Sequence, residues 1–142
     1  MIRYFDASAL AKRYVRSEGT TEVNRWLRTA PAATCRLTEV EIASALARRM
    51  REGTLSANAR EKALTVFRMD LRRMNVVELV PAVIDGVHAL FDRHALRAGD
   101  ALHLAAALFL RSRLGRTEFV VYDARLAAAA RAEKLTVLPT PP

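Results

Sequence analysis

MIRYFDASAL, residues 1–10, begins the chain with a short apolar run that ends in an aspartate and continues into helix-forming residues. Residues 2–5 predict a buried strand of a parallel sheet, because such strands read as short apolar runs. Asp6 then stands at the carboxyl end of this strand and at the start of a helix. An aspartate at such a joint can cap the helix by accepting a free backbone N–H group. Whether Asp6 does more depends on what else lies at the same edge.

Apolar periodicity and turn residues along the rest of the chain predict alternating strands and helices. The expected strands cover residues 2–5, 32–36, 76–80, 118–122 and 135–138, and the expected helices cover 7–16, 20–29, 39–51, 56–74, 82–94, 100–113 and 124–133. This alternation indicates an α/β fold, with a central parallel sheet of four to five strands and helices on both faces. In such folds strand carboxyl ends and helix amino ends meet at one edge, where ligands usually bind.

Length and composition predict one globular domain that spans residues 1–142, because 51% of its 142 residues are hydrophobic. The formal net charge of +8 favours a polyanionic partner such as a nucleic acid or an acidic protein. The single cysteine, Cys35, is expected to be a buried strand thiol and fits a reducing cytoplasm. No signal peptide or membrane-spanning run is evident, so we expect a soluble cytoplasmic protein.

Three further acidic residues stand at predicted helix starts. They are Glu41 in LTEVEIASAL (residues 37–46), Asp100 in LRAGDALHLA (96–105) and Asp123 in FVVYDARLAAAA (119–130). Each could be a cap, and Thr38 with Glu41 has the spacing of a capping box. Together with Asp6, however, they place four carboxylates from separate segments at one edge. Their mutual repulsion is costly unless a cation neutralises it.

A site made only of carboxylates prefers a hard cation, Mg²⁺ or Mn²⁺, with water completing the coordination. Zinc would favour histidine or cysteine ligands. His103 is expected to share a helix face with Asp100 and is interpreted as a packed residue, while His88 and His94 lie far from the joints. Acid clusters that hold Mg²⁺ activate water and stabilise phosphoryl oxygens, and a basic protein body holds a nucleic-acid backbone. The pattern therefore predicts hydrolysis of a phosphodiester.

Four stretches together resemble the PIN-domain ribonucleases, most closely the VapC-type toxins of prokaryotic toxin–antitoxin pairs. They are YFDASAL (4–10), LTEVEIASALARR (37–49), RAGDALHLAAAL (97–108) and VVYDARLAAAARAEKLTVL (120–138). The resemblance covers nearly the whole chain, and it rests on four motifs in order rather than on any one of them. It implies a compact three-layer α/β/α sandwich, a homodimer, an RNA substrate and a small antitoxin partner that blocks the pocket.

The resemblance also implies which residues form the site. Asp6, Glu41, Asp100 and Asp123 would bind Mg²⁺ or Mn²⁺, with Ser8 as a polar support. Members often carry a hydroxyl residue two positions before the fourth acid, where this chain has Val121. This difference removes a supporting hydrogen bond and makes Asp123 the least secure of the four.

Other functions remain open at this point. A PIN-type nuclease for RNA maturation or for structured DNA would share the same acids. In a non-catalytic binding module the acids would be only caps, and metal would not stabilise the protein. A receiver domain is disfavoured, because it needs an aspartate at the end of a middle strand, where this chain has Val80 and Pro81. The arginine-rich segment of residues 45–74 predicts a helical hairpin whose charges either face solvent or bind RNA or a partner.

Overall fold

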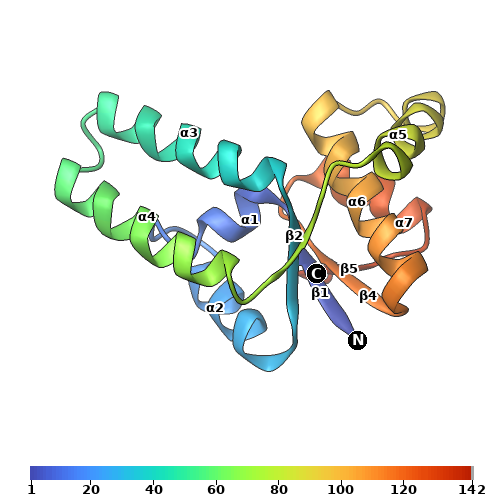
Figure 1. Cartoon of the computed structure of the whole chain (residues 1–142), viewed down its shortest axis with the longest axis horizontal. Helices are drawn as coiled ribbons and strands as arrows, with labels where there is room; N and C mark the ends of the chain where they lie inside the picture. Colours follow the sequence, from blue (N-terminus) through green and yellow to red (C-terminus); the bar gives the residue numbers. More distant parts are fainter. Residues whose placement is uncertain (142) are drawn as a thin grey trace.

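The computed structural model describes residues 1–141 and contains a five-stranded, all-parallel β-sheet (Figure 1). The strand order is β3-β2-β1-β4-β5, so the first strand of the chain lies in the middle. The strands are β1 (Ile2–Phe5), β2 (Ala32–Cys35), β3 (Asn75–Val77), β4 (Thr117–Val120) and β5 (Thr136–Leu138). The predicted parallel α/β fold is confirmed. Pro142, the end of the expected domain, lies outside the described residues.

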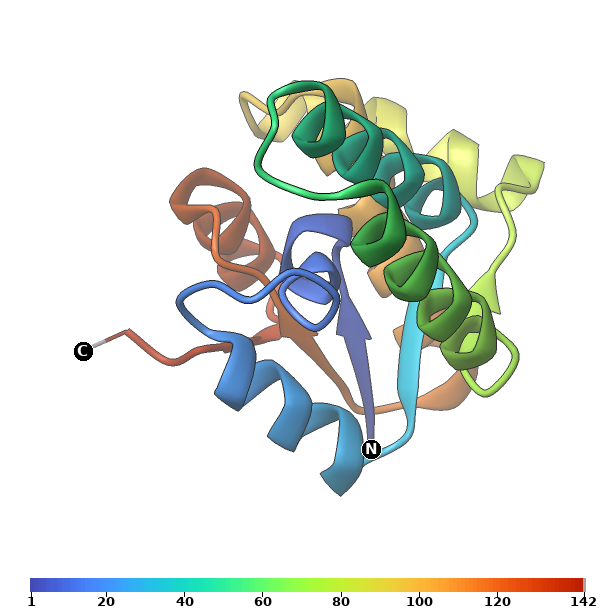
Figure 2. The same cartoon turned by 90° about the vertical axis from the view of Figure 1, so that its left-hand side faces the viewer.

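Helices cover both faces of the sheet, as the alternation predicts. They are α1 (Ala7–Ala11), α2 (Thr20–Thr29), α3 (Leu37–Arg51), α4 (Ala57–Leu71), α5 (Pro81–Arg93), α6 (Ala98–Leu114) and α7 (Ala124–Ala132). Figures 1 and 2 show α1 to α4 on one side of the sheet and α5 to α7 on the other. The expected three-layer α/β/α sandwich is therefore confirmed.

The middle strand anchors both halves of the core. Tyr4 and Phe5 are both fully buried, and successive side chains of a strand point to opposite faces. Tyr4 belongs to an apolar cluster with residues of α5, α6 and α7, including Leu104. Phe5 belongs to a second cluster with residues of α1, α3 and α4, including Phe67. Because β1 is fixed from both sides, the residue that follows it is held in a precise place.

The direction of strand addition changes beside β1. From β1 the chain adds β2 and β3 on one side, and it then crosses to add β4 and β5 on the other. β1 and β4 are thus neighbours, with Phe5 paired to Val120 in the register. In open α/β sheets the crevice for a ligand lies beyond the carboxyl ends of the strands at such a switch. Asp6 and Asp123 follow these two strands.

Three predicted elements are wrong in length. The helix expected over 7–16 ends at Ala11, after which the N–H groups of residues 12–14 bond to carbonyls three residues back, as Tyr14 does to Ala11 (3.0 Å). The carbonyl of Lys12 instead accepts a hydrogen bond from Thr20, which turns the chain toward α2. The strand expected over 76–80 ends at Val77, because its partner β2 ends at Cys35 and the chain then enters α5. The helix expected over 56–74 ends three residues early, at Leu71, and the other boundaries agree within two residues.

Candidate metal-dependent active site

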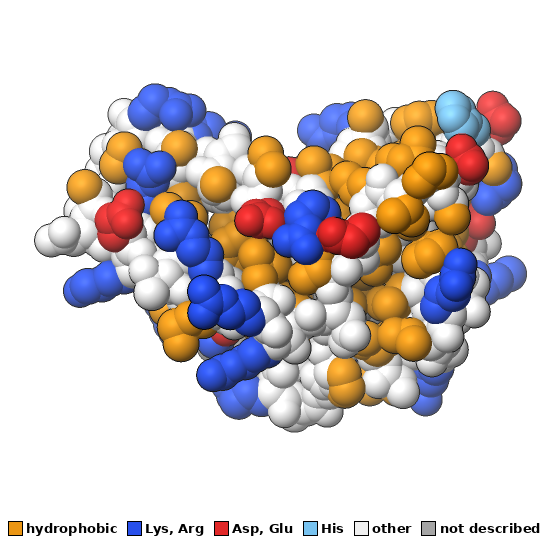
Figure 3. Space-filling view, viewed as in Figure 1, with side chains coloured by type: hydrophobic (Ala, Val, Ile, Leu, Met, Phe, Trp, Pro, Cys, Tyr) orange, Lys and Arg blue, Asp and Glu red, His pale blue; other side chains and the backbone are white. Residues whose placement is uncertain are grey.

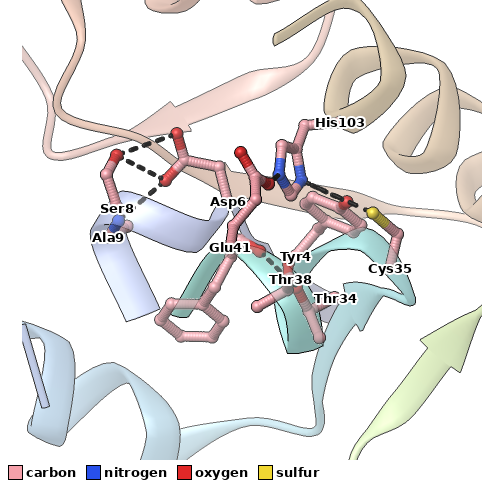
Figure 4. Close-up of polar contacts among 10 residues, drawn as sticks. Tyr4, Asp6, Ser8, Ala9, Thr34, Cys35, Thr38, Glu41 and His103 are labelled. Carbon is pink, nitrogen blue, oxygen red and sulfur yellow. Dashed lines mark hydrogen bonds and ion pairs between the residues drawn. The ribbon is translucent and has the colours of Figure 1, made fainter. Parts of the chain in front are cut away.

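Asp6 caps α1, as its position at a strand-to-helix joint predicts. Its Oδ1 atom accepts a hydrogen bond from the backbone N–H of Ala9 (2.8 Å), and the hydroxyl of Ser8 lies 3.3 Å from Oδ2 (Figure 4). Only 3% of Asp6 is exposed. Burial raises the pKa of Asp6 to about 6, and the charge of Asp100 adds to this rise, whereas His103 and the hydrogen bonds oppose it. The capping bonds therefore do not fully offset the cost of a charge here.

Glu41 projects from α3, and its interpretation as part of a capping box is wrong. The helix begins directly after Arg36, so Thr38 is its second residue rather than its N-cap. The hydroxyl of Thr38 is buried and lies 2.7 Å from the hydroxyl of Thr34 in the preceding strand. The Glu41 side chain is 38% exposed, and its Oε1 atom lies 2.6 Å from Nε2 of His103. Glu41 thus faces another helix of the site rather than its own backbone.

Asp100 lies in the first turn of α6, and its interpretation as the cap of that helix is also wrong. Arg97 holds the N-cap position and makes no side-chain cap bond. The Oδ2 atom of Asp100 lies 3.5 Å from Nε of Arg97, whose side chain is 82% exposed. A pair whose arginine is this exposed, with 3.5 Å between the two atoms, contributes little to stability. The carboxylate of Asp100 can therefore exchange this arginine for another cation at small cost.

Three of the four predicted acids share one cleft of about 370 Å³. The side chains and backbone that line it are those of Asp6, Ala7, Ser8, Glu41, Arg97, Gly99, Asp100 and His103. The acids reach it from three elements, namely the end of β1, the second turn of α3 and the first turn of α6. A Cβ atom at Gly99 would lie 3.4 Å from Oε2 of Glu41, so this oxygen faces the first turn of α6.

Asp123 does not line this cleft. It caps α7, and its Oδ1 atom accepts a hydrogen bond from the backbone N–H of Leu126 (2.8 Å). Its place is nevertheless close to the switch, three residues beyond the end of β4, the neighbour of β1. Val121, two residues before Asp123, is apolar and buried, so no hydroxyl supports Asp123 from that position. The site role of Asp123 stays a prediction.

His103 contributes more than packing, which the sequence reasoning missed. The residue is only 2% exposed, and its ring joins Glu41 to two core side chains, Tyr4 (Nδ1 to hydroxyl, 2.8 Å) and Cys35 (Nδ1 to Sγ, 3.7 Å). Burial opposes a charged ring, but the hydrogen bonds to Cys35 and Glu41 and the charge of Asp6 raise the pKa of His103 to about 10. The spacing of three residues after Asp100 was the available signal, because it places both side chains on one helix face.

The donor chemistry of the cleft fits a hard divalent cation. Its acidic side chains offer carboxylate oxygens, the ligands that Mg²⁺ and Mn²⁺ prefer. The charge of Asp100 raises the pKa of the buried Asp6, so a cation between these two carboxylates would relieve their repulsion. Within residues 1–141, however, no three acidic, histidine or cysteine side chains already stand at the spacing of a preformed metal cage. The protein would supply Asp6, Glu41 and Asp100, and water would complete the coordination.

The comparison with known families decides the identity of the fold. The PIN domain model matches residues 3–132, which include all four predicted acids. The chain belongs to the PIN domain family. Ribonuclease VapC47 of Mycobacterium tuberculosis (strain CDC 1551 / Oshkosh) is 35% identical over 133 residues, which cover 90% of this chain and 89% of that protein. The resemblance to VapC-type PIN domains is therefore confirmed.

Solved structures share the fold of this PIN domain at low sequence identity. The complex of VapBC2 from Rickettsia felis with a DNA fragment from its promoter contains a chain with a TM-score of 0.68 and 11% identity, covering 96% of this chain and 97% of that chain. A toxin–antitoxin complex from Klebsiella pneumoniae contains a chain with a TM-score of 0.64 and 19% identity, covering 89% and 90%. Within the described 141 residues, none of the helices is long and apolar enough to span a bilayer.

Proposed function

We propose that this PIN domain is a divalent-metal-dependent endoribonuclease and the toxin of a toxin–antitoxin pair. The observation that carries the proposal is the meeting of Asp6, Glu41 and Asp100 in one cleft, with Asp6 almost fully buried. The net charge of +8 suits a polyanionic substrate. The relative named Ribonuclease VapC47 supports RNA as that substrate. In this proposal the chain acts as a single domain in the cytoplasm.

A bound Mg²⁺ or Mn²⁺ would lower the pKa of a coordinated water and stabilise charge on phosphoryl oxygens. The residues of the chain orient the groups around it. The Ala9 N–H group and the Ser8 hydroxyl fix the carboxylate of Asp6, and Glu41 and Asp100 close the cleft from the two flanking helices. We include Asp123 as the fourth acid, because its capping bond uses Oδ1 and leaves Oδ2 for the metal or a bound water.

Cleavage of a defined RNA by the purified protein tests this proposal. We expect internal cuts in the presence of Mn²⁺ or Mg²⁺ and none in EDTA. Asp100→Asn should reduce the rate more than about 100-fold, because it removes a negative charge from the cation site. Asp92→Asn, an exposed change on α5, should leave the rate unchanged. Cleavage that persists in EDTA, or an Asp100→Asn protein as active as the wild type, would refute the proposal.

Arg97 is positioned to bind a phosphate of the RNA. Its largely exposed side chain lines the cleft, and among the described residues its one ion pair is with Asp100. A guanidinium matches the geometry of a phosphate, and hydrogen bonds to charged groups contribute about 1.5–3 kcal/mol. Steady-state kinetics on a short RNA should therefore show a KM about tenfold higher for Arg97→Ala, with a smaller change in kcat. Arg113→Ala at the other end of α6 is the control, and an unchanged KM for Arg97→Ala would remove Arg97 from the substrate site.

A groove beside the cleft suits a protein partner. It has a volume of about 400 Å³ and is lined by Ala7, Ser8, Ala11, Val40, Glu41, Ile42, Ser44, Ala45 and Arg48 of α1 and α3. Val40 is 65% exposed on it. We propose that a small antitoxin lays an apolar helix face in this groove and so covers the cleft. The toxin–antitoxin complexes among the structural neighbours support such a partner, and co-purification with the product of an adjacent gene tests it.

A second exposed apolar surface suits a homodimer. Figure 3 shows hydrophobic side chains gathered over the part of the molecule that carries α5 and α6. Large exposed residues in and beside these helices are Val80, Ile84, Phe91 and Leu114. Exposed apolar patches of this kind mark contact surfaces. We propose that a second copy covers this surface, which sedimentation of the purified protein tests.

A further inference from the structure

A buried chain of side chains connects the core to the acidic cleft. It runs from the Tyr4 hydroxyl to His103 Nδ1 (2.8 Å) and from His103 Nε2 to Glu41 Oε1 (2.6 Å) (Figure 4). Tyr4 is fully buried in the middle strand, whereas the Glu41 side chain is 38% exposed in the cleft. The imidazole of His103 thus links a fixed core residue to a side chain of the site.

The chemistry of the two groups decides which of them donates the hydrogen bond between His103 and Glu41. An ionised carboxylate oxygen can only accept, so Nε2 of His103 donates to Glu41. The ring is held on its other side by the hydroxyl of Tyr4, with the Cys35 thiol 3.7 Å from the same nitrogen. The Tyr4 ring is itself packed edge-on against Phe119, with 5.4 Å between ring centres. These contacts leave the imidazole little room to turn.

Glu41 needs such a support more than Asp6 does. Asp6 has a short side chain with two donors of its own, from Ala9 and Ser8. Glu41 has one more rotatable bond and reaches the cleft from a helix surface. Without a fixed donor, a side chain of this length loses more conformational freedom when it binds a metal. With Oε1 held by His103, Oε2 faces the first turn of α6, where Asp100 lies.

We propose that His103 is a positioning residue, which holds Glu41 ready to bind the divalent cation, and that the Tyr4 hydroxyl fixes the His103 ring. The proposal rests on the proposed metal-dependent function. It assigns no contact with metal or RNA to His103 itself. Hydrogen-bonded partners behind a ligand typically change metal affinity by about 10–100-fold when they are removed.

Calorimetric titration of the full chain with Mn²⁺ tests this role without any turnover. We expect His103→Leu to weaken Mn²⁺ binding about 10–100-fold and His103→Gln to restore much of it, because the glutamine amide can donate at the position of Nε2. Tyr4→Phe should weaken binding by a smaller factor. Tyr14→Phe is the matched control, since it also removes a hydrogen-bonded tyrosine hydroxyl, in this case one that donates to Asp70 (2.7 Å), away from the cleft. Mn²⁺ affinity that is unchanged or tighter in both His103→Leu and Tyr4→Phe would overturn the proposal.

If His103→Leu fails to fold, Mn²⁺ affinity that is unchanged or tighter in Tyr4→Phe overturns the proposal by itself. A second measurement separates this inference from the metal function. In the NMR spectrum of the metal-free protein, the His103 Nε2–H resonance should shift in Glu41→Gln and stay in place in Glu39→Gln, whose side chain bonds to Arg36 instead. A His103 resonance that does not shift in Glu41→Gln would overturn the positioning role even if the protein binds Mn²⁺. A normal shift in a protein that binds no Mn²⁺ would refute the proposed metal function alone.

Discussion

Asp6→Asn should abolish RNA cleavage and at the same time make the metal-free protein more stable at pH 7. The loss of cleavage follows from removing a negative charge at the most buried acid of the cleft. The gain in stability follows from the raised pKa of this carboxyl group. Asparagine is as good an N-cap as aspartate, so the bond from Ala9 is expected to survive.

The pH dependence of this gain has a definite sign. The pKa of Asp6 is about 6 in the folded protein and near its ordinary value of 3.8 in the unfolded chain. Between about pH 4 and pH 6 the folded state therefore binds more protons, and stability falls as the pH rises through this window. Above pH 6 the full cost is present, up to about 3 kcal/mol. The gain from Asp6→Asn should thus be absent near pH 3.5 and largest at neutral pH.

Urea unfolding of wild type and Asp6→Asn in EDTA, at several pH values, measures this difference. Asp123→Asn is a suitable comparison, because it changes a second N-cap aspartate that is only partly buried. An Asp6→Asn protein that is less stable than wild type at pH 7 would mean that the charged carboxylate of Asp6 stabilises the metal-free fold, contrary to the account. Retained cleavage by Asp6→Asn would remove it from the site altogether.

Glu41→Gln should leave the protein folded and reduce RNA cleavage more than about 100-fold. The change keeps the size of the side chain and a carbonyl oxygen that can accept from His103, but it removes the negative charge that would balance a bound cation. Stability should change little, because the Glu41 side chain is not a helix cap. The comparison is Glu39→Gln, two residues closer to the start of α3 and bonded to Arg36 on the surface.

Glu41→Gln and Glu39→Gln each remove one negative charge, but only Glu41 lines the cleft. A comparison of their cleavage rates therefore isolates the role of Glu41 in the site. Glu39→Gln should cleave RNA at the wild-type rate. An active Glu41→Gln protein would reduce the site to aspartates and leave His103 with a structural role only. Equal losses in both variants would point to a general effect of charge near α3 rather than to coordination.

The sequence predicts the fold well, because local patterns and the sheet agree. The apolar run of β1 is short and ends at a charged residue, and its side chains alternate between two cores, as the pattern of a buried strand requires. The length of α1 could not be predicted in this way. Its end depends on the contact between Lys12 and Thr20, eight residues apart, which no helical periodicity encodes.

Within the site, the sequence predicts which acids meet but not how they are held. Asp6, Glu41 and Asp100 share a cleft because strand ends and helix starts gather at one edge. The predicted capping box is wrong because β2 ends early and α3 begins one residue before Thr38. The hydroxyl of Thr38 is therefore buried against Thr34. The partners of His103 come from β1, β2 and α3, so its role could be found only once these elements were packed together.

The most direct test of the account is to locate Mn²⁺ in crystals of the free protein by its anomalous scattering. The account predicts one strong peak in the cleft, in contact with carboxylate oxygens of Asp6 and Asp100 and close to Glu41. The same crystals show whether Asp123 turns its Oδ2 atom toward the ion. A cleft without a peak in crystals soaked in millimolar Mn²⁺, or a peak only at a site away from Asp6, would contradict the central claim that these acids form a metal-dependent nuclease site.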